Sequence, residues 1–389
     1  MKRQHEEHPA KMSGGGAGGG AGGGAGGGAG GGAGGGAGGG AGGGAGGGAG
    51  GGAGQLGDYL ASHEALIRNR SALANPADTL PYSTPRWTDF IAPGTSADDS
   101  SAQRLARWDG WVVPYVVLPG LLAGLRVQEA ADRTRCQLLV GTADQQTLDV
   151  VRPDVSVFRA QLADVIADAE LREDRAPEIL MQTQGVNAFF ATVLPITAAR
   201  TPATLQLLGI ANQAAIFVEM QMKHVFACAR PHEYSPQVQP MIATPGHGTY
   251  PMGHGCEAQV TARLLAALTQ SASVDDPAWH SMRHQLDTLA ERIAENRIVS
   301  GVHFRVDQWA GKALGDALAE YVMAFSNEAS SPTLPVRVYD PAGGASEAVT
   351  GTPVAVTLPA ADLRREMCLI WKRARAEWRW LHNDPLPTP

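Results

Sequence analysis

Apolar residues recur at every third or fourth position through most of the chain beyond residue 153, and this spacing predicts α-helices. Between residues 154 and 172 the apolar positions are Val155, Phe158, Leu162, Val165 and Ile166. Further helical patterns or long apolar stretches cover 179–193, 202–230, 253–270, 277–297 and 303–325. The expected fold class is therefore all-α, a helical bundle.

Proline and threonine mark the ends of the longest of these patterns. Thr201 precedes Pro202, the order expected of an N-cap residue and a first helical residue. The helix is predicted to run to Arg230, because Pro231 cannot continue it. A loop rich in Pro, Gly and Thr follows over 231–251.

Strand patterns are sparse. The segments 335–339 and 353–358 predict a small hairpin around a Gly-rich turn. A last helix carries an apolar stripe and a basic opposite face, which favours docking on the core over lying on a membrane surface. The stripe comprises Met367, Trp371, Ala374, Trp378 and Leu381, and the basic face Arg364, Arg365, Lys372, Arg373 and Arg375.

The most apolar run, 111–125, contains two prolines and is shorter than the ~20 residues that span a bilayer. We expect a buried helix or helix pair there and no membrane span. The N-terminus lacks the apolar core of a secretory signal, so the expected location is cytoplasmic or left open. A start codon at Met12 or further downstream is also compatible with the sequence.

The first 54 residues differ from the rest in composition. Residues 14–54 repeat Gly-Gly-Gly-Ala, and such a tract buries almost no surface while losing much backbone entropy on ordering. We expect a disordered Gly/Ala-rich tail over 1–54 and a single helical domain over 55–389. Prolines over 76–93 predict a short helix and a wrapping loop at the start of that domain.

The bulk composition excludes some function classes. The 389 residues are 44% hydrophobic and 18% charged, which is an ordinary globular balance. A net charge of -7 does not favour a nucleic-acid partner. The four cysteines form no C-x-x-C pair, so a zinc or redox motif is not expected and free thiols are favoured over disulfides. A homo-oligomer is compatible with these features.

Three short segments carry candidate chemistry. In the first, Lys223 and Arg230 are seven residues apart in an apolar helical pattern, so both are expected on one helix face. In the second, Gly253 and His254 begin a helix, where backbone N–H groups and an imidazole can meet an oxyanion. By themselves, an exposed cation pair and an ordinary turn would explain these two segments.

The third segment contains Arg297, His303 and Asp307. Ser300 and Gly301 predict a break, with Arg297 ending one helix and His303 beginning the next. Asp307 lies one helical turn beyond His303, where a carboxylate can orient the imidazole.

Taken in order, these segments read Lys-(six residues)-Arg-Pro, Pro-x-Gly-His and Arg-(five residues)-His-(three residues)-Asp. Their types, order and spacing resemble the motifs of the phosphatidic acid phosphatase type 2 and vanadium haloperoxidase superfamily. The resemblance covers 223–307, which is the expected anion site, and it implies a helical bundle.

The resemblance also implies roles for the motif residues. Lys223, Arg230 and Arg297 would bind the oxygens of phosphate or of a vanadate cofactor, and Gly253 would let the backbone approach the anion. His303 would be the vanadium ligand of a peroxidase or the nucleophile of a phosphatase. His254 would be the acid–base residue, with Asp164 and Asp168 as candidate acidic partners. Asp307 completes the expected catalytic set.

Two positions depart from the motifs of the family. Met252 stands where Ser is usual, and Asn296 replaces a Ser that commonly precedes the third-motif Arg. The missing hydroxyl at 252 removes one hydrogen bond to the anion, worth ~1.5–3 kcal/mol. An inactive bundle that now serves as a structural or interaction module is therefore one interpretation of this sequence.

His247 separates the two enzymatic interpretations. It lies seven residues before His254, and bromoperoxidases of the family are similar in carrying a His at this offset, whereas chloroperoxidases carry an aromatic residue. The favoured expectation is a vanadium-dependent haloperoxidase in which hydrogen peroxide oxidises a halide, bromide in the first place, with an organic acceptor as a further partner. The alternative is a phosphomonoester hydrolase that forms a phosphohistidine. A loop histidine without a role is an equal interpretation of His247.

Overall fold

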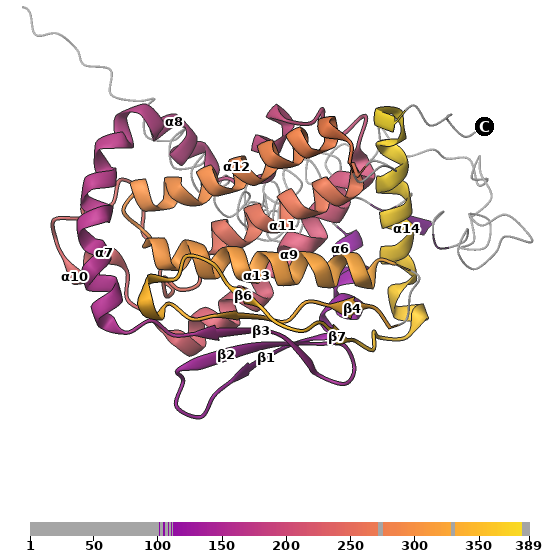
Figure 1. Cartoon of the computed structure of the whole chain (residues 1–389). Coiled ribbons are helices and arrows are strands. Elements are labelled where there is room, and N and C mark those ends of the chain that lie inside the picture. Colours follow the sequence, from indigo (N-terminus) through magenta and orange to yellow (C-terminus); the bar gives the residue numbers. More distant parts are fainter. Residues whose placement is uncertain are drawn as a thin grey trace, which may run out of the picture.

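A computed structural model describes residues 112–270, 275–327 and 331–382, together with residues 101, 104, 105, 108 and 110. The tail expected over 1–54 and the helix and loop expected over 55–100 lie outside these ranges. In the described part the fold is mainly helical, and a β-sheet packs along one side of the helices (Figure 1).

The centre of the bundle is α11 (Gly253–Leu268), which packs against three other long helices. These are α9 (Pro202–Phe226), α12 (Pro277–Val299) and α13 (Arg305–Phe325). Most of α11 is buried, because small and branched apolar residues face its neighbours on every side. The bounds of α11, α12 and α13 agree with the sequence prediction to within a few residues.

The end of α9 was predicted wrongly. The helix stops at Phe226, four residues before Arg230, because Ala227 adopts a left-handed conformation with φ of 48°. The chain then crosses to a short helix, α10 (Pro231–Tyr234). Lys223 lies in the last turn of α9 and Arg230 lies beyond it, so the two cations do not project from one helix face as expected.

The start of α9 is capped by a distant residue. Pro202 is the first helical residue, as predicted, but the Thr201 side chain does not cap the helix. The Glu377 carboxylate instead accepts from the backbone N–H groups of Ala203 (2.7 Å) and Thr204 (2.9 Å). A carboxylate at this end of the helix also complements the helix dipole.

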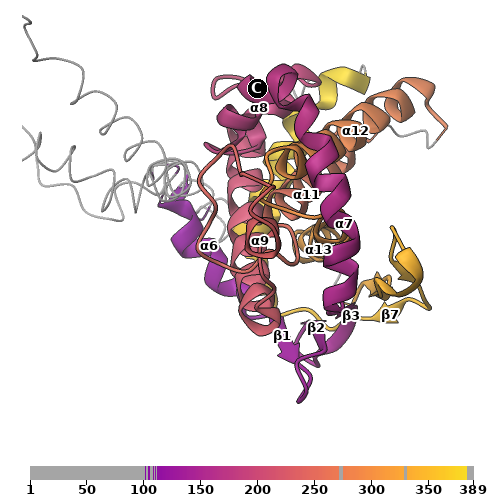
Figure 2. The same ribbon diagram turned by 90° about the vertical axis from the view of Figure 1, so that its left-hand side faces the viewer.

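Helices α7 (Val155–Asp168) and α8 (Arg172–Gln182), joined by a 3-10 turn at Ala169–Leu171, form the outer wall beside α12. Figure 2 shows α7 running alongside the inner helices. A further 3-10 helix, Asn187–Thr192, follows α8. The predicted helix over 154–172 is present, whereas the apolar stretch over 179–193 is divided between the end of α8 and this 3-10 helix.

The sheet corrects the all-α expectation. Strands β1 (Leu125–Glu129), β2 (Arg135–Val140) and β3 (Gln145–Val151) form an antiparallel meander. β3 pairs in parallel with β5 (Arg337–Tyr339), which pairs with β6 (Val349–Thr350). The strand order is β1-β2-β3-β5-β6, and the inner face of the sheet packs on α9 and α13.

The predicted C-terminal hairpin is also only partly present. β5 falls within the predicted segment 335–339, but its partners are β3 and β6. β7 (Val354–Ala355) pairs instead with β4 (Thr333–Leu334). The apolar run over 111–125 gives one helix, α6 (Val113–Leu122), and then enters β1.

The last helix, α14 (Ala361–Glu377), docks on α9 and α6 as expected. Met367, Ala374 and Trp378 are fully buried, and the Trp378 indole donates to Thr204 Oγ1 at 2.9 Å. Arg364 is an exception to the predicted solvated basic face, because it is buried and donates to the Asn327 carbonyl. A short 3-10 helix, Arg379–His382, follows.

All four cysteines are free thiols. In the described ranges, none of the helices combines the length and the apolar character that crossing a membrane requires. Nor do these ranges hold a cluster of three or more His, Cys, Asp or Glu side chains arranged to bind a metal ion.

Candidate active site

The three motif segments converge on one cavity of about 760 Å³ between α9, α11, α12 and the loop over 235–252. Six of the predicted site residues line it: Arg230, His247, Gly253, His254, Arg297 and His303. Two others do not line it: Asp307 contacts His303 in the wall, and Lys223 contacts the loop that leads into α11. The structure thus places the residues of all three motifs at one site.

His303 is held by a chain of polar contacts. It precedes α13 by two residues and follows Gly301, whose φ of 83° provides the predicted break after α12. Its Nδ1 lies 2.9 Å from Asp307 Oδ2 and 3.1 Å from Thr249 Oγ1, and its Nε2 lies 2.9 Å from Arg230 Nη1. Because Arg230 can only donate, Nε2 must accept and the proton belongs on Nδ1.

The charge state of His303 follows from these contacts. Burial, reinforced by Arg230 and Lys223, lowers the pKa of His303 well below its ordinary value. Burial raises the pKa of Asp307 to about 6, although hydrogen bonds from Phe304 N and Thr249 oppose this shift. His303 is therefore neutral, and its Nε2 lone pair faces the cavity beside a guanidinium group.

Arg230 joins the loop to the imidazole groups. Its guanidinium donates to the carbonyls of His247 (3.1 Å) and Val302 (2.8 Å) as well as to His303. Its Nη2 also lies 3.2 Å from His247 Nδ1. Burial lowers the pKa of Arg230, but an arginine stays charged under all ordinary conditions.

Arg297 enters the cavity from the last turn of α12. Its Nη2 donates to the Ile179 carbonyl (3.0 Å) and to Gln182 Oε1 (2.7 Å), both on α8. Its Nε is buried and has no hydrogen-bond partner among the described residues. Burial lowers the pKa of Arg297 to about 10. A buried cation with an unused donor is a group that an anion would satisfy.

Lys223 contacts the loop that leads into α11 and does not reach the cavity. Its Nζ donates to the carbonyls of Pro251, Thr249 (3.2 Å) and Gly248 (3.5 Å), which fixes the chain that leads into α11. Burial lowers the pKa of Lys223 to about 8. Lys223 therefore contributes positive potential and holds the loop, and it does not line the cavity itself.

His254 lies in the first turn of α11. Its Nε2 is 3.0 Å from the Gln182 carbonyl, so this backbone oxygen orients the ring and neither Asp164 nor Asp168 does. Asp168 instead pairs with Arg305 at 2.6 Å. Burial and the nearby Arg297 lower the pKa of His254 to about 3, which makes it neutral without a bound anion.

His247 also faces the cavity, and its Nδ1 contacts Arg230 and the Gly248 carbonyl (3.1 Å). Partial burial, with a contribution from Lys223, lowers the pKa of His247 to about 4. The loop position of His247 is thus fixed by the same arginine that contacts His303.

Two carboxyl groups in the cavity wall were not predicted. Glu219 on α9 and Glu257 on α11 both line it. Burial raises the pKa of Glu257 to about 7, and burial together with Glu257 raises the pKa of Glu219 well above its ordinary value. The only signal in the sequence was a glutamate one turn before Lys223 in an otherwise apolar segment.

Glycine is required at 253 by a close approach. A Cβ there would lie 2.6 Å from Glu219 Oε1, so a side chain would displace the carboxyl group or the helix start. The start of α11 is also uncapped by any side chain, since the N-cap residue is Met252. Its first N–H groups are thus available to an anion in the cavity.

Met252 points into the core. It is fully buried, its Sδ lies 3.3 Å from where a Cβ on Gly255 would be, and its N–H donates to the Asp307 carbonyl. Its side chain does not line the cavity. The core packing thus accommodates a methionine at this position.

Replacing Met252 with Ser is expected to destabilise the fold by about 2 kcal/mol, because the lost core volume outweighs a better N-cap. Chemical denaturation measures this, and Met252→Ala provides the matched variant without a hydroxyl. We expect Met252→Ser to bind sulfate up to about tenfold more tightly than Met252→Ala, through one added hydrogen bond. Equal affinities would show that a hydroxyl at 252 does not reach the anion.

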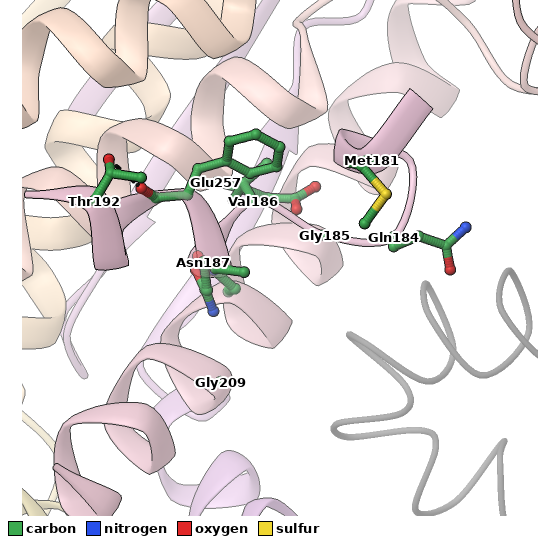
Figure 3. Close-up of a pocket in the computed structure, with 11 residues that line it drawn as sticks. Met181, Gln184, Gly185, Val186, Asn187, Thr192, Gly209 and Glu257 are labelled. Carbon is green, nitrogen blue, oxygen red and sulfur yellow. Dashed lines mark hydrogen bonds between the residues drawn. The ribbon is translucent and has the colours of Figure 1, made fainter. Parts of the chain in front are cut away.

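A second pocket, of about 500 Å³, adjoins the first and shares Gln184, Gly185 and Glu257 with it. Figure 3 shows Met181, Val186 and Asn187 around this pocket, with Glu257 at its wall. The combined space offers room for an organic group attached to an oxyanion.

Comparisons with known proteins add little to this geometry. No protein-family model matches the chain, and no curated protein matches it. One similar solved structure is described as the first transmembrane PAP2 type phosphatidylglycerolphosphate phosphatase from Bacillus subtilis. It has 16% sequence identity and a TM-score of 0.28, and the match covers 44% of this chain and 82% of that chain.

Proposed function

We propose that this chain is an oxyanion-processing enzyme of the phosphatidic acid phosphatase type 2 and haloperoxidase superfamily, and that it hydrolyses phosphomonoesters through a phosphohistidine. The observation that carries the proposal is the placement of the His303 imidazole. Asp307 holds its Nδ1 proton, and its Nε2 lone pair faces a cavity that contains Arg230 and Arg297.

In the proposed first step, the phosphoryl group binds between Arg230, Arg297 and the start of α11. Arg230 exchanges its contact with His303 Nε2 for the anion, which frees the lone pair. Nε2 then attacks phosphorus while the bond from phosphorus to the ester oxygen breaks. Positive charge that develops on the imidazole is stabilised by Asp307 through Nδ1.

His254 is proposed to move the proton. A bound phosphate dianion raises the pKa of a neighbouring imidazole, so His254 can take up a proton as the substrate binds. It gives this proton to the leaving oxygen and then accepts one from the water that attacks the phosphohistidine. The products are an alcohol and inorganic phosphate, and His303 is restored.

Vanadate-dependent halide oxidation is the second candidate, and His247 is the observation that favours it. Its ring lies against Arg230 and faces the cavity. This is the position expected of a residue that acts near a bound anion. A neutral imidazole nitrogen in a cation-lined cavity also fits vanadate, which would be held by His303 Nε2, Arg230 and Arg297. When bound, vanadate would supply Lewis-acid activation of hydrogen peroxide for oxidation of a halide.

Two assays run side by side separate these candidates. One measures p-nitrophenyl phosphate hydrolysis by vanadate-free protein, and the other measures bromide oxidation by protein reconstituted with orthovanadate and given hydrogen peroxide. We expect hydrolysis in the first assay that orthovanadate inhibits. Bromide oxidation without any hydrolysis would replace the first candidate with the second, and inactivity in both assays would refute an enzymatic role for these substrates.

Arg297→Ala is expected to weaken sulfate binding at least about tenfold, because one charge-assisted contact to the anion is lost. Isothermal titration measures this affinity. Arg283→Ala is the matched control, since Arg283 lies on the same helix, pairs with Asp287 at 3.8 Å and does not line the cavity. Unchanged sulfate affinity in Arg297→Ala would show that the anion site is placed wrongly.

A further inference from the structure

Glu219 places a carboxyl group in the wall of the anion cavity, and none of the three motifs accounts for it. The residue is 1% exposed, and neither carboxyl oxygen has a hydrogen-bond partner within the described part of the chain. Oε2 is buried outright, and Oε1 lies against the α-carbon of Gly253 at the start of α11. A buried polar group without a partner is costly unless a ligand satisfies it.

The surroundings of Glu219 disfavour its charged form. The groups that act on it are Glu257 and the Cys256 thiol on α11, Lys223 on its own helix, and Arg230 beyond that helix. Lys223 forms no ion pair with it, because the ammonium group is directed to three backbone carbonyls. Burial and Glu257 together raise the pKa of Glu219 well above its ordinary value, despite the two cations.

We propose that Glu219 binds the oxyanion as a neutral carboxylic acid, donating its O–H to an anion oxygen at the start of α11. The proposal rests on the anion site proposed above and adds a hydrogen-bond donor to it. A side-chain donor at the start of α11 is otherwise missing, because the N-cap residue Met252 has an apolar side chain that packs in the core.

If Glu219 acts in this way, the affinity for the anion depends on pH in a predictable direction. Below the pKa of Glu219 the O–H donates to the anion. Above that pKa the group carries a negative charge, which repels the anion and offers no donor. Anion affinity should therefore fall as pH rises.

Other groups of the site also titrate, so a variant must isolate Glu219. Glu257, with a pKa of about 7, and Lys223, with a pKa of about 8, also change charge between about pH 5 and about pH 9. The imidazole groups of His247 and His254 have pKa values of about 4 and about 3, so both stay neutral at pH values above those pKa values. Glu219→Gln keeps the size of the side chain and an N–H donor but cannot ionise, and it leaves every other residue of the site in place.

Sulfate is the probe, because it remains a dianion throughout the pH range of interest. Sulfate affinities of the parent and of Glu219→Gln are compared by isothermal titration from about pH 5 to about pH 9. We expect similar affinities at the acidic end and, at the alkaline end, binding by the parent that is at least about tenfold weaker than binding by Glu219→Gln. A ratio that does not change with pH would overturn the proposal.

Glu219→Leu tests the donor itself, since leucine is of similar size and can neither donate nor ionise. At about pH 5 we expect it to bind sulfate at least about tenfold more weakly than Glu219→Gln. Equal binding by these two variants would overturn the proposal even if both fold normally, which their melting temperatures would show.

The Arg297→Ala variant separates this inference from the proposed function. If Arg297→Ala weakens sulfate binding and the Glu219 variants do not, the anion site stands and the role of Glu219 is refuted. If Arg297→Ala has no effect, the anion site and the role of Glu219 are both refuted.

Discussion

Replacing His303 with Ala should abolish p-nitrophenyl phosphate hydrolysis, with a loss of at least about 10³-fold in kcat. Among the described residues, only the His303 imidazole combines two contacts in the cavity. Its Nε2 lies beside Arg230, and its Nδ1 proton is held by the Asp307 carboxylate. The other two imidazoles of the cavity have different contacts: His254 meets the Gln182 carbonyl, and His247 meets Arg230 and the Gly248 carbonyl. Arg230 and Arg297 remain in the variant, so sulfate binding should be weakened but measurable.

The controls for this variant lie on the surface and in the same cavity. His284→Ala, at an exposed position on α12, should leave hydrolysis unchanged. His254→Ala should slow hydrolysis while sulfate affinity stays near that of the parent, because its proposed role is proton transfer. Parental activity in His303→Ala would remove His303 from the mechanism, and with it the proposed function.

Asp307→Asn is expected to lower kcat by about 10² to 10⁴-fold while KM changes little, because an amide can hold the imidazole in the wrong tautomer. Asp307 is a positioning residue. Its Oδ2 contacts His303 Nδ1, Thr249 Oγ1 and Phe304 N, and its side chain does not line the cavity. The size of the side chain is preserved, so the fold should be retained.

Separate measurement of kcat and KM distinguishes positioning from binding. Asp316→Asn is a matched control on the same helix, where the carboxylate pairs with Arg263 at 3.2 Å and lies outside the cavity. We expect parental kinetics in this control. A rise in KM with unchanged kcat in Asp307→Asn would mean that Asp307 supports substrate binding and does not orient His303 for reaction.

The inner helices were predictable because their apolar periodicity is long and their boundaries carry strong local signals. Gly253 and Gly301 are examples: one starts α11 and the other, with positive φ, separates α12 from α13. The end of α9 was not predictable, because Ala227 carries no sequence signal for the left-handed conformation that it adopts. The relation between Lys223 and Arg230 therefore had to come from the structure.

The sheet was missed for a different reason. β1, β2 and β3 are short, and polar residues such as Gln137 and Asp149 interrupt their apolar positions. Their stability comes from pairing with one another and with β5, almost two hundred residues further on, which no local pattern reveals. Glu219 was missed similarly, because its importance depends on a contact with Gly253 across two helices.

A crystal structure of the protein soaked with orthovanadate would show directly whether the cavity holds an oxyanion beside His303. We expect vanadium bonded to His303 Nε2, with vanadate oxygens contacting Arg230, Arg297 and the start of α11. Such a complex would support the anion site under either candidate activity. A cavity without vanadate at saturating concentration, or vanadate bound away from His303, would contradict it.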